Sequence, residues 1–127
     1  MAYAPHPHHR DQSFAFKKSQ WIISEMDECQ CYQMADAKQW TASGACWGLY
    51  LVNNVPTNLG VSPLPLAAVV QIAKFVSDQG NWHGYPAMHW TSPYDKPHQT
   101  IVASWHKDGY IRRSAMSKIQ RGKRCVL

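Results

Sequence analysis

The sequence predicts a small, mainly α-helical domain of four or five helices joined by loops that contain Pro and Gly. Three observations support this fold class. Apolar residues recur at helical spacing in several stretches, and Gly or Pro residues separate these stretches. The 127 residues are 45% hydrophobic and 17% charged, which is typical of one globular domain.

The chain divides into a short N-terminal segment and one domain. Residues 1–13 contain Pro5, Pro7 and three histidines but no apolar periodicity, so we expect a flexible or surface-lying arm. Residues 14–127 are predicted to form a single globular domain that ends in a basic helix.

A first helix is predicted from about Ser19 up to a break at Gly44. Four apolar residues fall at helical spacing: Trp21, Ile22, Met26 and Cys29. Tyr32, Ala35 and Gln39 could carry the helix further. The eight apolar residues 45–52 that follow are interpreted as another helix, with a buried strand as the alternative.

A third helix is predicted after the loop at residues 53–60. Ser62 and Pro63 form a typical helix start, and Gly80 a typical stop. The residues between them recur at helical spacing: Leu66, Val69, Val70, Ala73 and Val76. Residues 82–94 are aromatic and rich in turn-forming residues, and we expect a structured loop there.

Two short helices are predicted at the C-terminal end. The first begins at Pro97, turns Ile101, Val102 and Trp105 inward, and ends at Gly109. The second is capped by Ser114 and stops at Gly122. Its inward residues are Ala115, Met116 and Ile119, and its outward cations are Lys118 and Arg121. A short hairpin near residues 100–113, which would make the fold α+β, is the alternative because Asp-Gly is a strong hairpin signal.

Nearly all of the positive charge lies in this C-terminal segment. Residues 107–127 carry a net charge of +6, whereas the whole chain carries +5. A helix-turn-helix-like segment with an exposed basic face suits contact with phosphates. The predicted binding residues are Arg112, Arg113, Lys118, Arg121, Lys123 and Arg124.

The partner of this segment is predicted to be nucleic acid or an acidic protein surface, since Arg and Lys bind both phosphates and carboxylates. The second case would make the chain an inhibitor or immunity-type protein. Aromatic residues such as Trp82, Trp90 and Tyr94 could stack on unpaired bases beside the charge. The alternative is that the two tryptophans are buried against the preceding helix.

One pattern points to an enzyme instead. In the run Ser43-Gly44-Ala45-Cys46-Trp47, Cys46 lies shortly after a glycine, at a possible helix start whose dipole would activate the thiol. This Cys-Trp pair resembles the nucleophile of papain-like peptidases, which implies a cysteine hydrolase with His83 or His89 as the base. We favour the alternative of a buried, unreactive cysteine.

The sequence lacks the signals of several other functional classes. The sequence contains no phosphate-binding loop and no close acidic pair, and Cys29 and Cys31 have no second matched pair for zinc. We therefore expect a non-enzymatic binding or regulatory protein without metal or cofactor. The eight-residue apolar run is shorter than the roughly 20 residues of a membrane span. Without a signal-peptide pattern, this predicts no membrane partner and a cytoplasmic location.

Overall fold

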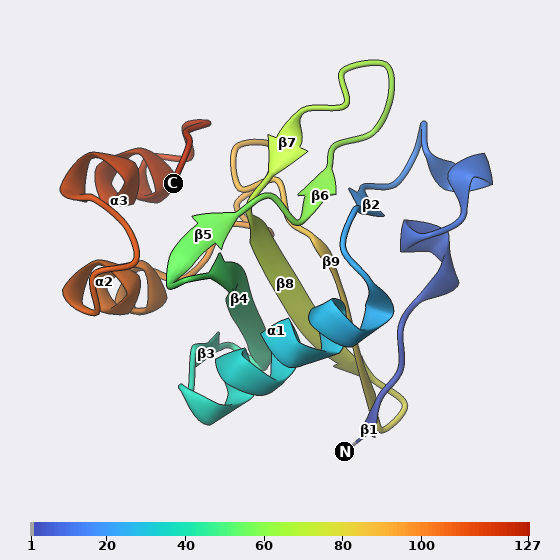
Figure 1. Ribbon diagram of the computed structural model, residues 1–127, viewed down its shortest axis with the longest axis horizontal. Helices are drawn as coiled ribbons and strands as arrows, with labels where there is room; N and C mark the ends of the chain where they lie inside the picture. Colours follow the sequence, from blue (N-terminus) through green and yellow to red (C-terminus); the bar gives the residue numbers. More distant parts are fainter. Residues whose placement is uncertain (1) are drawn as a thin grey trace.

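The computed structural model describes residues 2–127 and shows an α+β fold (Figure 1). Two β-sheets and three α-helices make up this part of the chain, together with two short 3-10 helices. The expectation of a mainly α-helical domain with four or five helices is therefore wrong.

A six-stranded sheet forms the centre of the molecule. Its order is β1 (Ala2–Tyr3), β9 (Asn81–Pro86), β8 (Ile72–Asp78), β4 (Ala45–Val52) and β3 (Thr41–Ala42), and β5 (Val55–Thr57) also pairs with β4. Only β1 and β9 pair in parallel. A smaller antiparallel sheet contains β2 (Gln20–Trp21), β6 (Gly60–Val61) and β7 (Val69–Val70).

Three tight turns explain why strands form where helices were predicted. The residue pairs 43–44, 53–54 and 79–80 connect β3 to β4, β4 to β5 and β8 to β9, and all six residues have positive φ. Two consecutive residues with positive φ are the mark of the type I′ hairpin turn, which favours Gly and Asn. Gly44 and Gly80 therefore close hairpins and do not stop helices.

Burial on both faces explains the composition of β4. A central strand covered on both sides has a continuous apolar run, which periodicity alone cannot distinguish from a helix. Residues 45–49 of β4 are all buried. The predicted helix at residues 66–76 is also wrong, since Leu66 of its expected inner face is 64% exposed and residues 69–76 lie mostly in β7 and β8.

Helix α1 (Glu25–Ala37) covers one face of the large sheet. It is shorter than the predicted helix from Ser19, because Ser24 caps it by accepting a hydrogen bond from the Asp27 amide. Close packing is possible at Gly48 of β4, where a Cβ atom would lie 3.2 Å from the Cys31 carbonyl oxygen and 3.4 Å from the Ala35 Cβ.

The two predicted C-terminal helices are present, and the hairpin alternative at residues 100–113 is wrong. They are α2 (Gln99–Lys107) and α3 (Arg113–Gln120), joined by a turn that contains Gly109. The predicted inner residues Ile101, Val102 and Trp105 are buried. Ser114 lies within α3 and does not cap it, because Arg112 occupies the N-cap position.

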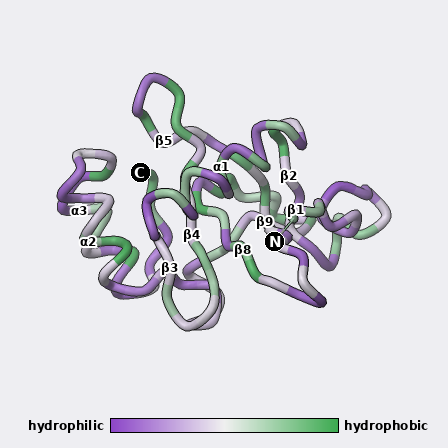
Figure 2. The backbone as a smooth tube through the Cα atoms, turned by 90° about the horizontal axis from the view of Figure 1, so that it is seen from below, coloured by the Kyte–Doolittle hydropathy of each residue, from purple (hydrophilic) through white to green (hydrophobic). Residues whose placement is uncertain are grey.

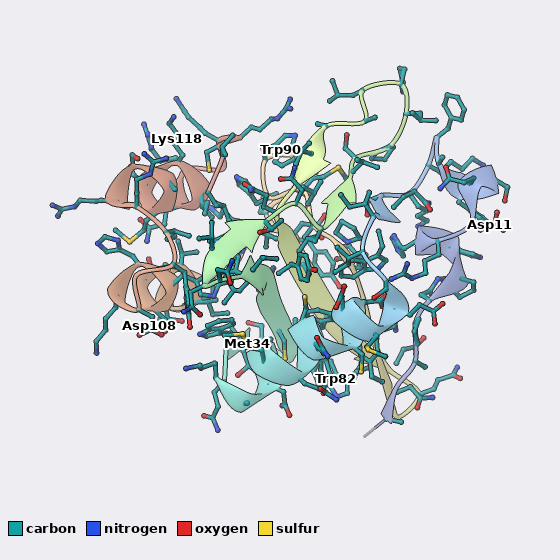
Figure 3. All side chains as sticks on the ribbon, in the orientation of Figure 1. Asp11, Met34, Trp82, Trp90, Asp108 and Lys118 are labelled. Carbon is teal, nitrogen blue, oxygen red and sulfur yellow. The ribbon has the colours of Figure 1, made fainter. Side chains whose placement is uncertain are left out.

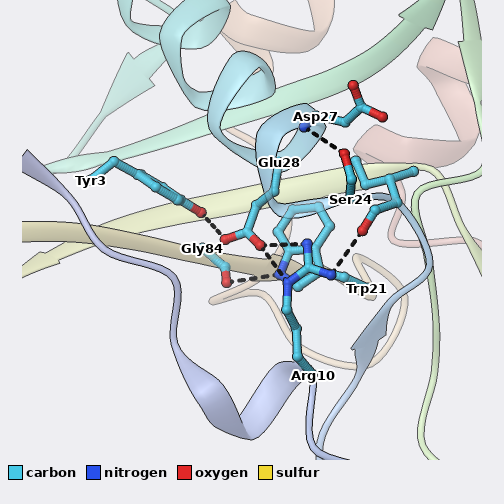
Figure 4. Close-up of polar contacts among 8 residues, drawn as sticks. Tyr3, Arg10, Trp21, Ser24, Asp27, Glu28 and Gly84 are labelled. Atoms are coloured by element: carbon cyan, nitrogen blue, oxygen red, sulfur yellow. Dashed lines mark hydrogen bonds and ion pairs between the residues drawn. The ribbon is translucent and has the colours of Figure 1, made fainter.

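The described part of the N-terminal segment, residues 2–13, lies on the surface and contacts both α1 and β9 (Figure 4). Tyr3 donates a hydrogen bond to Glu28 of α1. Arg10 donates to the same carboxylate from Nη2 at 2.8 Å, and to the Ile23 carbonyl oxygen from Nη1 at 2.8 Å. Glu28 is fully buried, so these contacts tie the segment to the domain. Met1 of the predicted arm at residues 1–13 lies outside the described residues.

Candidate nucleic-acid interface

The six predicted binding cations are all exposed and come from α3 and its two flanking segments. We call them the basic surface: Arg112, Arg113, Lys118, Arg121, Lys123 and Arg124. Helix α3 is amphipathic, since Ala115 and Ile119 are buried whereas Lys118 and Arg121, three residues apart, are exposed. Figure 2 shows hydrophilic and hydrophobic residues mixed along α2 and α3, and Figure 3 shows Lys118 on the outer side of α3. Burial of the inner residues thus fixes the direction of the cations.

Among the described residues, no carboxylate forms an ion pair with the basic surface. Within residues 2–127, the one ion pair joins Arg10 to Glu28, at the other end of the molecule. Arg121 donates from Nε to the Ser117 carbonyl oxygen at 3.3 Å, which is a local helical contact. The charges of the basic surface are therefore not neutralised by carboxylates of the same chain.

The loop before α2 holds the C-terminal tail in place. His89 is buried, and its Nε2 lies 2.7 Å from the Lys123 carbonyl oxygen. Lys96 donates from Nζ to the Gln120 carbonyl oxygen at 3.0 Å. These contacts fix the backbone on which Lys123 and Arg124 stand, so less conformational entropy is lost when a partner binds them.

The ring of Trp90 lies beside the basic surface. The guanidinium carbon of Arg124 is 5.6 Å from the ring centroid of Trp90, within the range of a cation–π contact. Trp90 also lines a small depression of about 210 Å³ together with Lys96 and Arg121. No acidic side chain is among the described residues that line it.

The other aromatic residues of the predicted loop are placed differently. Trp82 lies in β9, with its ring centroid 5.4 Å from that of Tyr32 on α1. Figure 3 shows Trp82 beside α1, whereas Trp90 lines a depression together with Arg121 and Gly122 at the end of α3. The expectation that residues 82–94 form a loop is wrong for β9, and Trp90 is the tryptophan of this segment next to the basic surface.

The three residues of the cysteine-hydrolase hypothesis do not meet. Cys46 lies within β4, 1% exposed, and not at a helix start, and burial raises the pKa of its thiol to about 11. The register places Cys46 on the same sheet face as Phe75 and His83 on the opposite face. His89 is engaged with the tail. The prediction of a buried cysteine is confirmed.

Sequence reasoning missed a second polar cluster, centred on Lys74. It had placed Lys74 in a helix, whereas this residue lies in β8 between Trp47 of β4 and Tyr85 of β9. Only strand pairing brings these three residues together, so neither spacing nor composition could have revealed the cluster.

Residues 2–127 contain no group of three or more His, Cys, Asp or Glu side chains placed to hold a metal ion. None of the helices in this part of the chain has the length and apolar character needed to cross a membrane. Comparisons of the sequence with protein-family models and with curated proteins, and of the fold with solved structures, found no match.

Proposed function

We propose that this protein binds nucleic acid through the basic surface, with α3 as the main contact helix. The supporting observation is that six exposed cations lie on α3 and its flanking segments, with no ion pair to any acid in residues 2–127. Phosphates of a nucleic-acid backbone supply the closely spaced negative charges that such a surface attracts. Trp90, beside Arg124, offers a ring on which an unpaired base can stack.

The same surface fits an acidic protein less well. Stable protein interfaces have a buried apolar core surrounded by polar residues. The outward side of α3 carries Lys118 and Arg121, and the remaining large apolar residue of this helix, Met116, is half-buried against the core. An inhibitor or immunity-type role with one acidic protein partner is thus the alternative, and the experiment below distinguishes it.

The salt dependence of binding tests the proposal. If about four of the six cations neutralise phosphates, the logarithm of the affinity falls against the logarithm of salt concentration with a slope of about −4 on duplex DNA and about −3 on a single strand. Fluorescence anisotropy with labelled oligonucleotides measures both slopes.

Two charge-matched double variants show whether the site is local. Lys118→Glu with Arg121→Glu should flatten the slope by about 2 and weaken binding to all sequences. Lys17→Glu with Lys18→Glu changes the net charge equally, at exposed positions on the N-terminal side of the domain, and should have much less effect. Equal losses from both pairs, or no binding by the parent protein at low salt, would refute the proposal. Capture of a partner that resists nuclease would then favour the acidic protein.

A further inference from the structure

Three neighbouring strands hold one short loop segment on the sheet face opposite α1. Trp47, Lys74 and Tyr85 are adjacent across β4, β8 and β9. The Trp47 indole N–H donates to the backbone carbonyl oxygen of Asp95 at 3.0 Å. The Tyr85 hydroxyl donates to the carboxylate of the same residue at 2.6 Å. Lys74 donates from Nζ to the Tyr94 carbonyl oxygen at 2.6 Å. The loop is therefore fixed by three side chains of the sheet.

Lys74 is a buried cation without an ion-pair partner. It is 2% exposed, and within residues 2–127 no carboxylate oxygen lies within 4 Å of its ammonium group. The ammonium nitrogen lies 3.1 Å from the ring centroid of Tyr94 and 5.1 Å from that of Trp47. Burial lowers the pKa of Lys74, and the charge of Asp95 partly opposes this effect. Removing a charge from water without a partner is unfavourable, so a bound anion would stabilise this group.

A pocket of about 430 Å³ opens beside Lys74. This is within the size range of small-molecule sites. Lys96 and His98 add nitrogen groups to its lining, and no acidic side chain is among its described lining residues. His98 is also the N-cap of α2, and helix N-termini favour anions. The lining thus selects a negative charge.

The aromatic residues of the pocket favour an anionic ligand that also contains a planar ring. Trp47 and Tyr94 both line the pocket, and Tyr94 is 68% exposed, with one ring face over Lys74. Because most of the Tyr94 side chain is exposed, a planar ring of a ligand can stack against it. We propose that this Lys74 pocket binds a phosphomonoester whose sugar also carries a planar ring, as in a nucleoside monophosphate.

A phosphomonoester of this kind can come from two sources. One is a free nucleoside monophosphate. The other is the phosphorylated end of a strand on the basic surface, because Pro93 and Lys96 line both the Lys74 pocket and the depression beside Trp90. The free nucleotide binds whether or not the basic surface contacts nucleic acid, so the two proposals can fail separately.

Calorimetry with a nucleoside monophosphate and the matching nucleoside tests the first source. We expect the monophosphate to bind at least tenfold more tightly and to shift the indole N–H signal of Trp47 in NMR spectra. Lys74→Met, which keeps a long unbranched side chain, should weaken monophosphate binding at least tenfold. Lys107→Met removes the same charge from an exposed position of α2 outside the pocket lining, and should change it less than twofold.

A second pair of variants keeps Lys74 intact. Val76 is half-buried, lines the pocket and lies on the same sheet face as Lys74, two residues away, so Val76→Glu places a carboxylate there, and Val76→Gln controls for size. Only the Glu variant should lose monophosphate binding. For the second source, a 5′-phosphorylated single strand should bind more tightly than its 5′-hydroxyl counterpart, and Val76→Glu should remove the difference. The proposal is overturned if neither the nucleotide nor the strand end gains from its phosphate, or if Val76→Gln weakens binding as much as Val76→Glu.

Discussion

Replacement of Trp105 by Ala should remove a large part of the stability of this domain. Trp105 is fully buried in α2, with its ring centroid 5.8 Å from that of Trp40 in an edge-to-face arrangement. A tryptophan buries roughly 150–250 Å², which at roughly 25 cal/mol per Å² corresponds to about 4–6 kcal/mol. Alanine keeps part of this contact, so we expect a loss of about 3–5 kcal/mol.

Phenylalanine at the same position should behave differently. The Trp105 indole Nε1 is buried and has no hydrogen-bond partner within residues 2–127. An unsatisfied buried donor costs about 1–3 kcal/mol. Trp105→Phe removes this donor while it loses part of the packing, and the two effects oppose each other. We expect a net change within about 1 kcal/mol.

Thermal and urea unfolding of the two variants measure these changes. A loss of 3–5 kcal/mol should lower the midpoint of Trp105→Ala by about 12–20 °C for a domain of this size. The phenylalanine variant should stay within about 4 °C of the parent protein. An unchanged midpoint in the alanine variant would show that Trp105 is not in the core. Equal losses in both variants would show that the indole N–H has a partner.

Three further predictions follow from buried polar groups and thiols. Burial lowers the pKa of His9 to about 4, so between about pH 6.5 and 4 the unfolded chain binds more protons than the folded protein, and the free energy of unfolding falls by about 1–2 kcal/mol as the pH falls. Urea unfolding of His9→Gln should therefore show a flatter pH dependence than the parent protein. An unchanged pH dependence would contradict a lowered pKa of His9. Arg10→Met should lower the free energy of unfolding by about 3 kcal/mol at pH 7, because it leaves the buried Glu28 carboxylate without its cation. The loss should be smaller at pH 4, where this carboxyl can bind a proton. A loss that does not change with pH would show that the Glu28 charge is not its cause. Cys46, with its pKa raised to about 11, should be alkylated slowly in the native protein at pH 7, and Cys46→Ser should leave oligonucleotide affinity unchanged. Fast stoichiometric alkylation would show instead that the thiol is accessible.

The sequence was a good guide where a local pattern admits one structure. In α2 and α3, two turns of amphipathic helix follow directly from the spacing of residues such as Ile101, Trp105, Ala115 and Ile119. The charge excess of the C-terminal segment is likewise a property of the sequence, and its cations are exposed because the opposite side of α3 is buried. Whether they bind nucleic acid remains a prediction.

Only the tertiary structure decided between helix and strand in the middle of the chain. Residues 45–52 are apolar without alternation because α1 covers one face of β4 and the loop around Asp95 covers the other, which no local pattern reports. The Lys74 pocket depends on this pairing too. Trp47, Lys74 and Tyr85 are far apart in the sequence and meet only through the register of β4, β8 and β9, because hydrogen bonds between strands set which side chains become neighbours.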